Sequence, residues 1–196
     1  GNGNDATQSV ATAQPKIVSA GSLVTDANGK PEFYFDGTDD YLQNATFFTS
    51  GADTTIFVAE IDNALSQMTF VDSVIGNVST SDHVIITRPT TPTHFGAFFG
   101  ATTDLDYAAI NTNQNLHWVY KAAVSGNSYG RLNGNQDSIN AGVDPYNGLR
   151  IGSVRDTPSG FLQGSVSEVI VYNSDQTANV AAIEANIADA YGITLA

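Results

Sequence analysis

The sequence predicts an all-β protein, an antiparallel β-sandwich with one α-helix near the C-terminus. Three observations lead to this fold class. Apolar and polar residues alternate with a period of two from residue 30 to about residue 172, which is the pattern of half-buried strands. Gly, Asn, Asp, Ser, Thr and Pro separate the alternating segments and supply the backbone angles of turns. No helical periodicity interrupts these strands, which excludes a parallel α/β fold.

The expected strands follow one another closely along the chain. They cover residues 32–35, 55–61, 69–75, 83–87, 94–99, 107–110, 116–124, 129–132, 149–153 and 164–172. About ten to twelve strands, with a turn signal roughly every 8–15 residues, are typical of antiparallel sandwiches and barrels. No Pro-rich linker, charge run or internal repeat divides the chain. We therefore expect a single domain over residues 1–196.

A helix is expected over about residues 177–191, after the last strand. Thr177 is a suitable N-cap, and Gly192 stands where a glycine would end the helix in a left-handed conformation. The helix carries one apolar stripe with the spacing i, i+3, i+7 and i+11, made of Val180, Ile183, Ile187 and Tyr191. Such a helix is expected to cover one end of the sandwich in a purely structural role.

The charge balance of the chain excludes several classes of partner. The 196 residues include seven Lys and Arg against twenty Asp and Glu, a formal net charge of -13. Nucleic acids and anionic membranes bind clustered basic residues, whereas the basic residues here are few and dispersed. No apolar run approaches the roughly 20 residues of a membrane-spanning helix, so we expect no membrane insertion. Because the chain has no cysteine, disulfides, thiolate catalysis and cysteine-type zinc sites are excluded.

The start of the sequence is unlike that of a complete translation product. The first residue is Gly1, and the only methionine is Met68. We therefore expect a processed protein or a piece of a longer one. A signal peptide would already have been removed from a processed chain, so its absence from the sequence carries no information.

Several segments, in the order in which they occur, resemble a known family. They are residues 1–7 (GNGNDAT), 35–42 (FDGTDDYL), 116–120 (LHWVY), 129–134 (YGRLNG), 149–152 (LRIG), 161–173 (FLQGSVSEVIVYN) and 191–193 (YGI). Together they resemble the concanavalin A-like lectin/glucanase superfamily, in its laminin G-like jelly-roll branch of bacterial and viral type. The resemblance spans nearly the whole chain and is most specific in its last block, from LRIG to the end of the helix.

The resemblance implies a jelly roll of two packed antiparallel sheets, one convex and one concave. Members of the superfamily are most often carbohydrate-binding or adhesive modules of larger secreted or virion proteins. Others are structural, and some are glycoside hydrolases, so that the fold alone does not choose among these functions. The resemblance also implies an extracellular location, on a cell surface or on a virion surface.

The hydrolase function can be tested against the sequence. Laminarinase-type members of the superfamily carry the pattern E-x-D-x-x-E on one strand, and retaining hydrolysis needs two carboxyl groups about 5–5.5 Å apart. Glu60 and Asp62 begin this pattern, but Leu65 stands where the second glutamate belongs. The remaining glutamates, which do not complete the pattern, are Glu32, Glu168 and Glu184. We therefore expect a protein that is not an enzyme.

Sugar binding calls for exposed aromatic rings beside planar polar groups. The candidates for these roles are Trp118, Tyr120, Tyr107, Tyr129, Asp106, Arg131 and Arg88. Trp118 and Tyr120 share one face of their strand and His117 lies on the other, because side chains alternate along a strand. If the first face is the concave surface, the two aromatic residues line a groove. If it is the core, they are packing residues and His117 lies outside.

An acidic turn is the main candidate for a metal site. Asp36, Asp39 and Asp40 could coordinate calcium through their carboxylate oxygens, although their spacing is not that of an EF-hand loop. The alternative is a tight hairpin in which the Asp side chains accept hydrogen bonds from backbone N–H groups. Asp104 and Asp106, with nearby loop carbonyls, form a second candidate set. Calcium binding is common among proteins of the superfamily that the chain resembles.

Two functions remain open after these arguments. The first is a non-catalytic module that binds a polysaccharide or a cell-surface glycan. The second is a structural or decoration domain of a virion, fibre or cell surface, which acts through contacts with other subunits. The weakly charged, Asn-, Thr- and Gly-rich sequence suits both functions.

Overall fold

The computed structural model describes most of the chain. The described residues are 3–50, 53–62, 69–72, 83–88, 94–99, 105–109, 114–123, 128–139, 142–144, 146–154 and 158–196. Within the strands, only the backbone is described at residues 48–50, 61–62, 83–88, 94, 105–109, 137, 139 and 146. The ends of three expected strands, at residues 73–75, 110 and 124, lie outside the described ranges.

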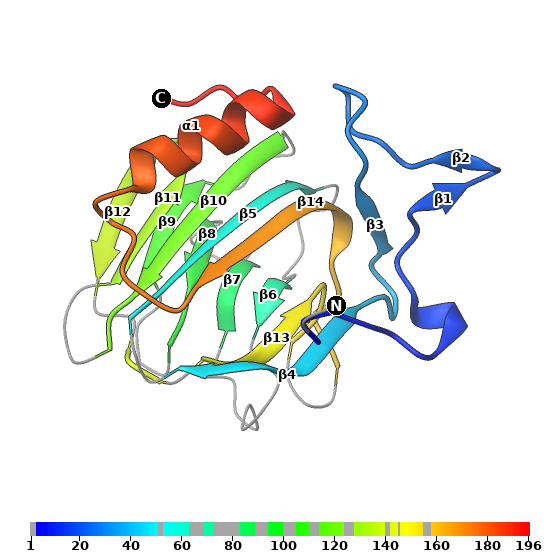
Figure 1. The fold of residues 1–196 in the computed structure, drawn as a ribbon, viewed down its shortest axis with the longest axis horizontal. Coiled ribbons are helices and arrows are strands. Elements are labelled where there is room, and N and C mark those ends of the chain that lie inside the picture. The colour runs from blue at the N-terminus through cyan, green and yellow to red at the C-terminus, as the bar shows by residue number, and fades with distance from the viewer. Residues whose placement is uncertain are drawn as a thin grey trace.

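Two six-stranded antiparallel sheets pack face to face, which confirms the predicted all-β sandwich (Figure 1). In the first, here called the β10 sheet, the strand order is β12 (Asn135–Ile139), β11 (Ser128–Leu132), β10 (Gln114–Lys121), β5 (Thr54–Asp62), β14 (Gln163–Tyr172) and β3 (Phe33–Asp36). In the second, the β7 sheet, the order is β4 (Leu42–Ser50), β13 (Tyr146–Ile151), β6 (Thr69–Asp72), β7 (His83–Arg88), β8 (His94–Ala97) and β9 (Leu105–Ala109). The strands β4 and β12 were not among those expected from the sequence.

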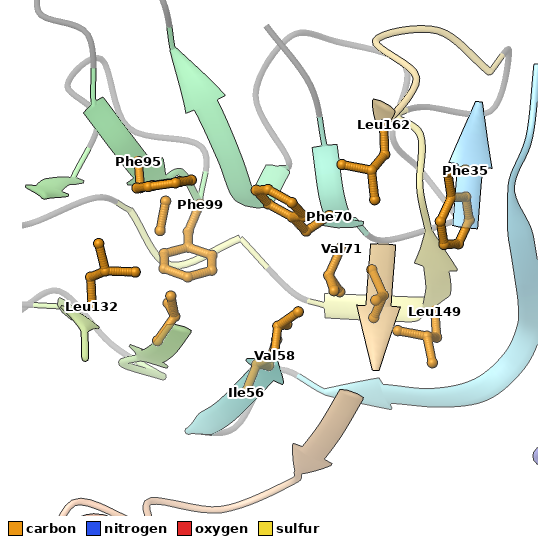
Figure 2. Close-up of a cluster of buried hydrophobic side chains, with 13 residues drawn as sticks. Phe35, Ile56, Val58, Phe70, Val71, Phe95, Phe99, Leu132, Leu149 and Leu162 are labelled. Carbon is orange, nitrogen blue, oxygen red and sulfur yellow. The ribbon is translucent and has the colours of Figure 1, made fainter. Parts of the chain in front are cut away.

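The main hydrophobic core lies between the two sheets. Ile56 and Val58 of β5 face Phe70 and Phe95, which come from β6 and β8 of the opposite sheet (Figure 2). All four side chains are buried, and each such side chain stabilises the fold by about 1.5–3 kcal/mol relative to an exposed one. The alternation of apolar and polar residues along a strand therefore favours this sandwich, because every second side chain points into the layer between the sheets.

The N-terminal segment closes one side of the sandwich. Thr7 pairs with Gln43 of β4, and Lys16 pairs with Tyr34 of β3, so that one segment contacts the edge strands of both sheets. A 3₁₀ turn (Ala11–Ala13) lies between these two contacts, and a hairpin of β1 (Val18–Ser19) and β2 (Ser22–Leu23) lies between Lys16 and β3. We call residues 10–33 the N-terminal arm. In Figure 1 its hairpin extends away from both sheets.

One α-helix, α1 (Val180–Tyr191), lies across the outer face of the β10 sheet (Figure 1). It begins at Val180 with Asn179 as its N-cap, so the prediction of Thr177 as N-cap is wrong; the Thr177 N–H donates a hydrogen bond to the Asp175 carboxylate, which holds that segment in a turn. Gly192 ends the helix with a φ of 67°, as predicted. No helix in the described part of the chain has the length and apolar character that crossing a lipid bilayer requires.

A second apolar layer joins α1 to the β10 sheet. On the helix side, Val180 and Ile187 are buried, as expected for the predicted stripe, whereas Ile183 and Tyr191 are only half-buried. The sheet contributes the buried residues Phe57, Ala59, Leu116 and Trp118. Because this sheet is covered on both faces, β10 buries consecutive residues rather than every second one.

Candidate functional site

The two faces of β10 serve two different layers of the protein. His117 and Val119 face the core between the sheets, whereas Trp118 faces α1. His117 is fully buried, so the expectation that it would lie outside if Trp118 packed in a core is wrong. Trp118 is 1% exposed and packs against Phe57 with ring centroids 6.3 Å apart, and it is therefore not an open stacking surface. The sequence could not show that the helix covers the outer face of this sheet.

A surface pocket of about 350 Å³ lies between the β10 sheet and the first turn of α1. Its lining residues come from β10, β11, β12 and the start of the helix, and they are Trp118, Tyr129, Arg131, Gln136, Thr177 and Val180. The ring of Tyr120 lies 5.7 Å from that of Tyr129 and extends the aromatic wall. The sequence-predicted residues Trp118, Tyr120, Tyr129 and Arg131 thus come together at one place on the surface.

Arg131 crosses the pocket to a helix residue that sequence reasoning missed. Its Nη2 lies 3.1 Å from Oε2 of Glu184, and its guanidinium carbon lies 6.0 Å from the centre of the Trp118 ring. Glu184 is only 1% exposed, and burial raises the pKa of its carboxyl group while Arg131 lowers it. Glu184 follows Val180 by four residues and precedes Ile187 by three, so the helical period placed it on the apolar stripe.

Three polar atoms around this pocket lack a hydrogen-bond partner among the described residues. They are the indole Nε1 of Trp118, the Nε of Arg131 and the Oε1 of Glu184, and all three are shielded from solvent. The first two are N–H donors, and the third is a carboxylate acceptor. Because none of the three atoms is exposed, they belong to the packing between the β10 sheet and α1, and a ligand in the pocket does not reach them.

Acidic residues flank the aromatic wall of the pocket. Burial, together with the nearby carboxylates of Asp53 and Asp175, raises the pKa of Tyr120 to about 12. The side chains of Asp53 and Asp175 are at least partly exposed. The electrostatic potential at this end of the pocket is therefore negative.

Three sequence-predicted site residues lie elsewhere in the fold. Arg88 is on β7, and Asp106 and Tyr107 are on β9, so all three belong to strands of the β7 sheet. Only the backbone is described at these positions, and Asp104 lies outside the described residues. Their roles in ligand or calcium binding stay predictions.

The acidic turn is held by its own side chains, but the expectation of a hairpin is wrong, because the turn leads from β3 of the β10 sheet to β4 of the β7 sheet and these strands do not pair. Oδ2 of Asp40 accepts a hydrogen bond of 3.0 Å from the Asp36 N–H, and Oδ1 of Asp36 accepts one of 2.8 Å from the Thr38 N–H. These are the backbone bonds expected for the turn alternative. Carboxylate oxygens of Asp36, Asp39 and Asp40 also lie within 4.8 Å of one another, so the cluster could hold a metal ion through oxygens that the turn leaves available.

Glu60, the first residue of the incomplete hydrolase pattern, lies inside the sandwich. Its Oε1 is 2.6 Å from Nε2 of His117, and both side chains are fully buried. The His117 ring packs against Phe70 and Phe95, with ring centroids 5.4 Å and 4.6 Å apart. The pair is therefore part of the core between the sheets. The side chain of Asp62 and the whole of Leu65 lie outside the described part of the structure.

Comparison with known proteins identifies shared folds. No family model and no curated protein matches the chain. The NanB sialidase of Streptococcus pneumoniae matches with a TM-score of 0.59 at 12% identity, over 76% of this chain and 27% of that one. A heptameric SAP-like pentraxin of Limulus polyphemus matches with a TM-score of 0.58 at 12% identity, over 76% of this chain and 78% of that one.

A sialidase of Trypanosoma rangeli in complex with sialic acid also matches. Its TM-score is 0.57 at 11% identity, over 80% of this chain and 28% of that one. The chain thus spans about a quarter of the length of the sialidases that it matches. At these identities the likeness shows a common fold, and the pentraxin and part of each sialidase share the β-sandwich architecture described above.

Proposed function

We propose that this protein is a non-catalytic glycan-binding module and that its ligand occupies the pocket beside α1. The observation that carries the proposal is the pocket itself, where the aromatic residues Trp118 and Tyr129 lie beside the polar residues Arg131, Gln136 and Thr177. Pockets for small ligands combine apolar and aromatic walls with a few placed polar groups, and this one has that composition. The half-buried ring of Tyr129 offers a face on which a sugar ring can stack.

Other observations support a role in carbohydrate recognition without catalysis. One sialidase that shares the fold was solved with sialic acid bound, and sugar recognition by the present chain would be of the same general kind. Glu60 forms a bond with His117 inside the core, so it is not available to a ligand at the surface. Calcium at the Asp36–Asp40 turn would be structural, because this turn lies at the end of β3, at the opposite edge of the β10 sheet from β11 and β12. Such a module would act outside the cell.

Replacing Tyr129 with alanine is expected to weaken glycan binding about tenfold or more, because an aromatic contact contributes about 0.5–1.5 kcal/mol beyond the area that it buries. The measurement is a glycan-array screen, followed by titration calorimetry on the best ligand with and without calcium.

The matched control is Tyr34→Ala, the same substitution on β3 at the opposite edge of the same sheet. It is expected to leave the affinity unchanged. A screen in which no polysaccharide binds in either buffer, or a ligand whose affinity is equal for both variants, would refute the assignment of this pocket.

A second candidate function, assembly with other subunits, is favoured by the N-terminal arm. Most of the large apolar side chains exposed among the described residues lie on it, namely Val10, Ile17, Val18, Leu23 and Phe33. The arm also carries Lys16 and Lys30, which are exposed, whereas Lys121 and Arg150 are buried. An apolar surface with basic residues is complementary to the strongly acidic remainder of a second copy of this chain.

The arm predicts self-association that depends on concentration and salt. The triple variant Ile17→Ser, Val18→Ser and Leu23→Ser is expected to sediment as a monomer at concentrations where the wild type forms larger species in low salt. Val143→Ser serves as control, because Val143 is also an exposed apolar residue but lies outside the arm. A wild type that remains monomeric throughout a sedimentation-equilibrium series would remove this candidate.

A further inference from the structure

A second pocket, here called the edge pocket, opens between the two sheets where the N-terminal arm joins β3. It has a volume of about 150 Å³ and lies between β3 and β14 of the β10 sheet and β4 and β13 of the β7 sheet. Most of its lining is apolar and includes Phe33, Phe35, Leu42, Leu149, Ile151 and Val169. Phe35 and Leu149 are buried at its base, whereas Phe33 is 37% exposed, so the pocket reaches the surface beside Phe33.

The interior of the edge pocket suits an uncharged apolar group. Among its described lining residues only Glu168 is charged, and the carboxylate of Glu168 bonds to the Tyr191 side chain of α1. An apolar cavity of about 150 Å³ excludes water and takes up benzene. The four carbon atoms of a leucine side chain are a smaller group than benzene, so one such side chain fits.

The β1–β2 hairpin of the arm presents side chains of this kind. Val18 and Leu23 are partners across the hairpin, so their side chains lie on the same face, and they are 52% and 57% exposed. Ala20 and Gly21 form the turn with φ angles of 51° and 83°, which is the two-residue turn that matches the twist of a hairpin. The hairpin is therefore a preformed apolar projection, and it extends away from the sheets of its own molecule (Figure 1).

The distribution of charge favours a second copy of this chain as the source of the inserted group. The arm has two exposed lysines, whereas its two acidic residues, Asp26 and Glu32, are buried. These four charges cancel, so the formal net charge of -13 comes from the rest of the chain. The acidic turn (residues 36–40) joins β3 to β4, which both line the edge pocket, and it brings carboxylates to the rim. A hairpin whose arm exposes only basic charges is complementary to such a rim.

We propose that two copies of the chain associate by inserting the β1–β2 hairpin of each into the edge pocket of the other, with Leu23 as the side chain that enters. Phe33 is the last residue of the arm and also lines the pocket, so hairpin and pocket lie at the same edge of the molecule. Reciprocal insertion about a two-fold axis closes the assembly at a dimer. The inference rests on the second candidate function, assembly, because it names the surface that receives the arm.

The first test fills the pocket and leaves the arm intact. Val169→Phe adds an aromatic ring to the lining and is expected to raise the dissociation constant of the dimer about tenfold or more in sedimentation equilibrium at low salt, because a filled pocket cannot accept the anchoring side chain. Val171→Phe is the matched control, since Val171 is on the same strand and packs on the same core but does not line the pocket. It is expected to dimerise like the wild type.

Thermal melting shows whether each variant is folded. A folded Val169→Phe protein that dimerises like the wild type, or an equal loss for Val171→Phe, overturns the inference and leaves assembly through the arm standing. A wild type that stays monomeric at every concentration removes both.

A second test does not depend on the folding of Val169→Phe. The ¹⁵N-labelled triple variant Ile17→Ser, Val18→Ser and Leu23→Ser keeps its edge pocket, and unlabelled wild type is titrated into it. The amide signals of pocket residues such as Val169 are expected to shift, whereas unlabelled triple variant should cause no shift. Shifts that spare the pocket residues, or no shifts at all, overturn the inference.

Discussion

Replacing Glu60 with alanine is expected to lower the free energy of unfolding by about 3–5 kcal/mol, the usual cost of removing one member of a buried pair. The Glu60 and His117 side chains are both fully buried and joined at 2.6 Å. Without Glu60, Nε2 of His117 would be left without that partner between Phe70 and Phe95. Urea denaturation at neutral pH measures the loss.

Glu60→Gln is the matched variant, because its amide retains a group that can bond to His117 in a side chain of the same size. It is expected to cost about 0.5–1.5 kcal/mol, the net value of a typical hydrogen bond. Equal losses for the alanine and glutamine variants would contradict this expectation, because they would show that the amide keeps none of the bond to His117 and that the packing of the longer side chain adds nothing.

The same pair predicts an unusual dependence of stability on pH. Burial raises the pKa of Glu60 well above its ordinary value of 4.5, and burial lowers the pKa of His117 from 6.5 to about 3. The folded pair therefore holds one proton over a wide range, whichever of the two side chains carries it. The unfolded chain holds two protons on these residues below pH 4.5, one between pH 4.5 and pH 6.5, and none above.

The sign of the effect follows from this proton count. Between pH 4.5 and pH 6.5 the folded and unfolded states bind equal numbers of protons, so the pair's contribution to stability is constant. Below that window the unfolded state binds one proton more, and above it one fewer, so the contribution falls on both sides by up to about 1.4 kcal/mol per pH unit. In the folded Glu60→Gln variant, His117 stays unprotonated down to about pH 3, whereas the unfolded variant binds a proton at His117 below pH 6.5. The stability of the variant should therefore start to decrease as soon as the pH drops below 6.5, and it should not decrease above pH 6.5.

Substituting alanine for Gly152 is expected to destabilise the fold by about 3–5 kcal/mol. A Cβ atom at this position would lie 2.4 Å from Cε1 of Phe35, which is fully buried and can yield little. The φ of Gly152 is 89°, which adds backbone strain for any residue with a side chain. Thermal and urea unfolding of the variant measure the combined cost.

Gly21→Ala separates the two contributions. Gly21 has a nearly identical φ of 83° in the turn of the β1–β2 hairpin, but a Cβ there would meet no atom within 4 Å. This control is expected to cost about 1–2 kcal/mol, which is the penalty of a left-handed backbone alone. If the two variants were equally stable, the contact between Gly152 and Phe35 would be too loose to matter.

Strands β5 and β14 of the β10 sheet were predictable because runs of apolar and β-branched residues between turn residues are local signals of a strand. Residues 55–61 and 164–172 were expected as strands and lie within β5 and β14. β4 was missed because Asn44 and Thr46 look like turn residues. In the structure Asn44 donates hydrogen bonds to the carbonyls of Gly3 and Asp5, contacts between segments far apart in the sequence that no local pattern reveals.

The candidate site was predictable in its residue types but not in its geometry. Tyr129 and Arg131 were expected near a hairpin and do line the pocket. The burial of Trp118 depends on where α1 packs, and the pairing of Glu184 depends on the position of Arg131. Both depend on the tertiary structure, which local sequence patterns do not reveal. A lone glutamate on a terminal helix is usually solvated, so its position on the apolar stripe was the single available signal.

Two of the segments that carry the sequence resemblance turn out to be neighbours in space. Gly152, which ends the LRIG segment, lies against the ring of Phe35, which begins the FDGTDDYL segment. The guanidinium of Arg150 lies 5.3 Å from the ring of Tyr41, between the same two segments. The two motifs are separate in the sequence, but their residues pack against each other in the fold.

Because α1 forms one wall of the pocket, a ligand bound there would also stabilise the packing of α1 on the β10 sheet. A molecule bound there touches Thr177 and Val180 as well as the sheet, so it binds only while the helix is docked. By mass action, a ligand at about one hundred times its dissociation constant adds roughly 2.7 kcal/mol to the docked state. A ligand in the pocket would therefore add to the stability that the apolar layer beneath α1 already gives the docked helix.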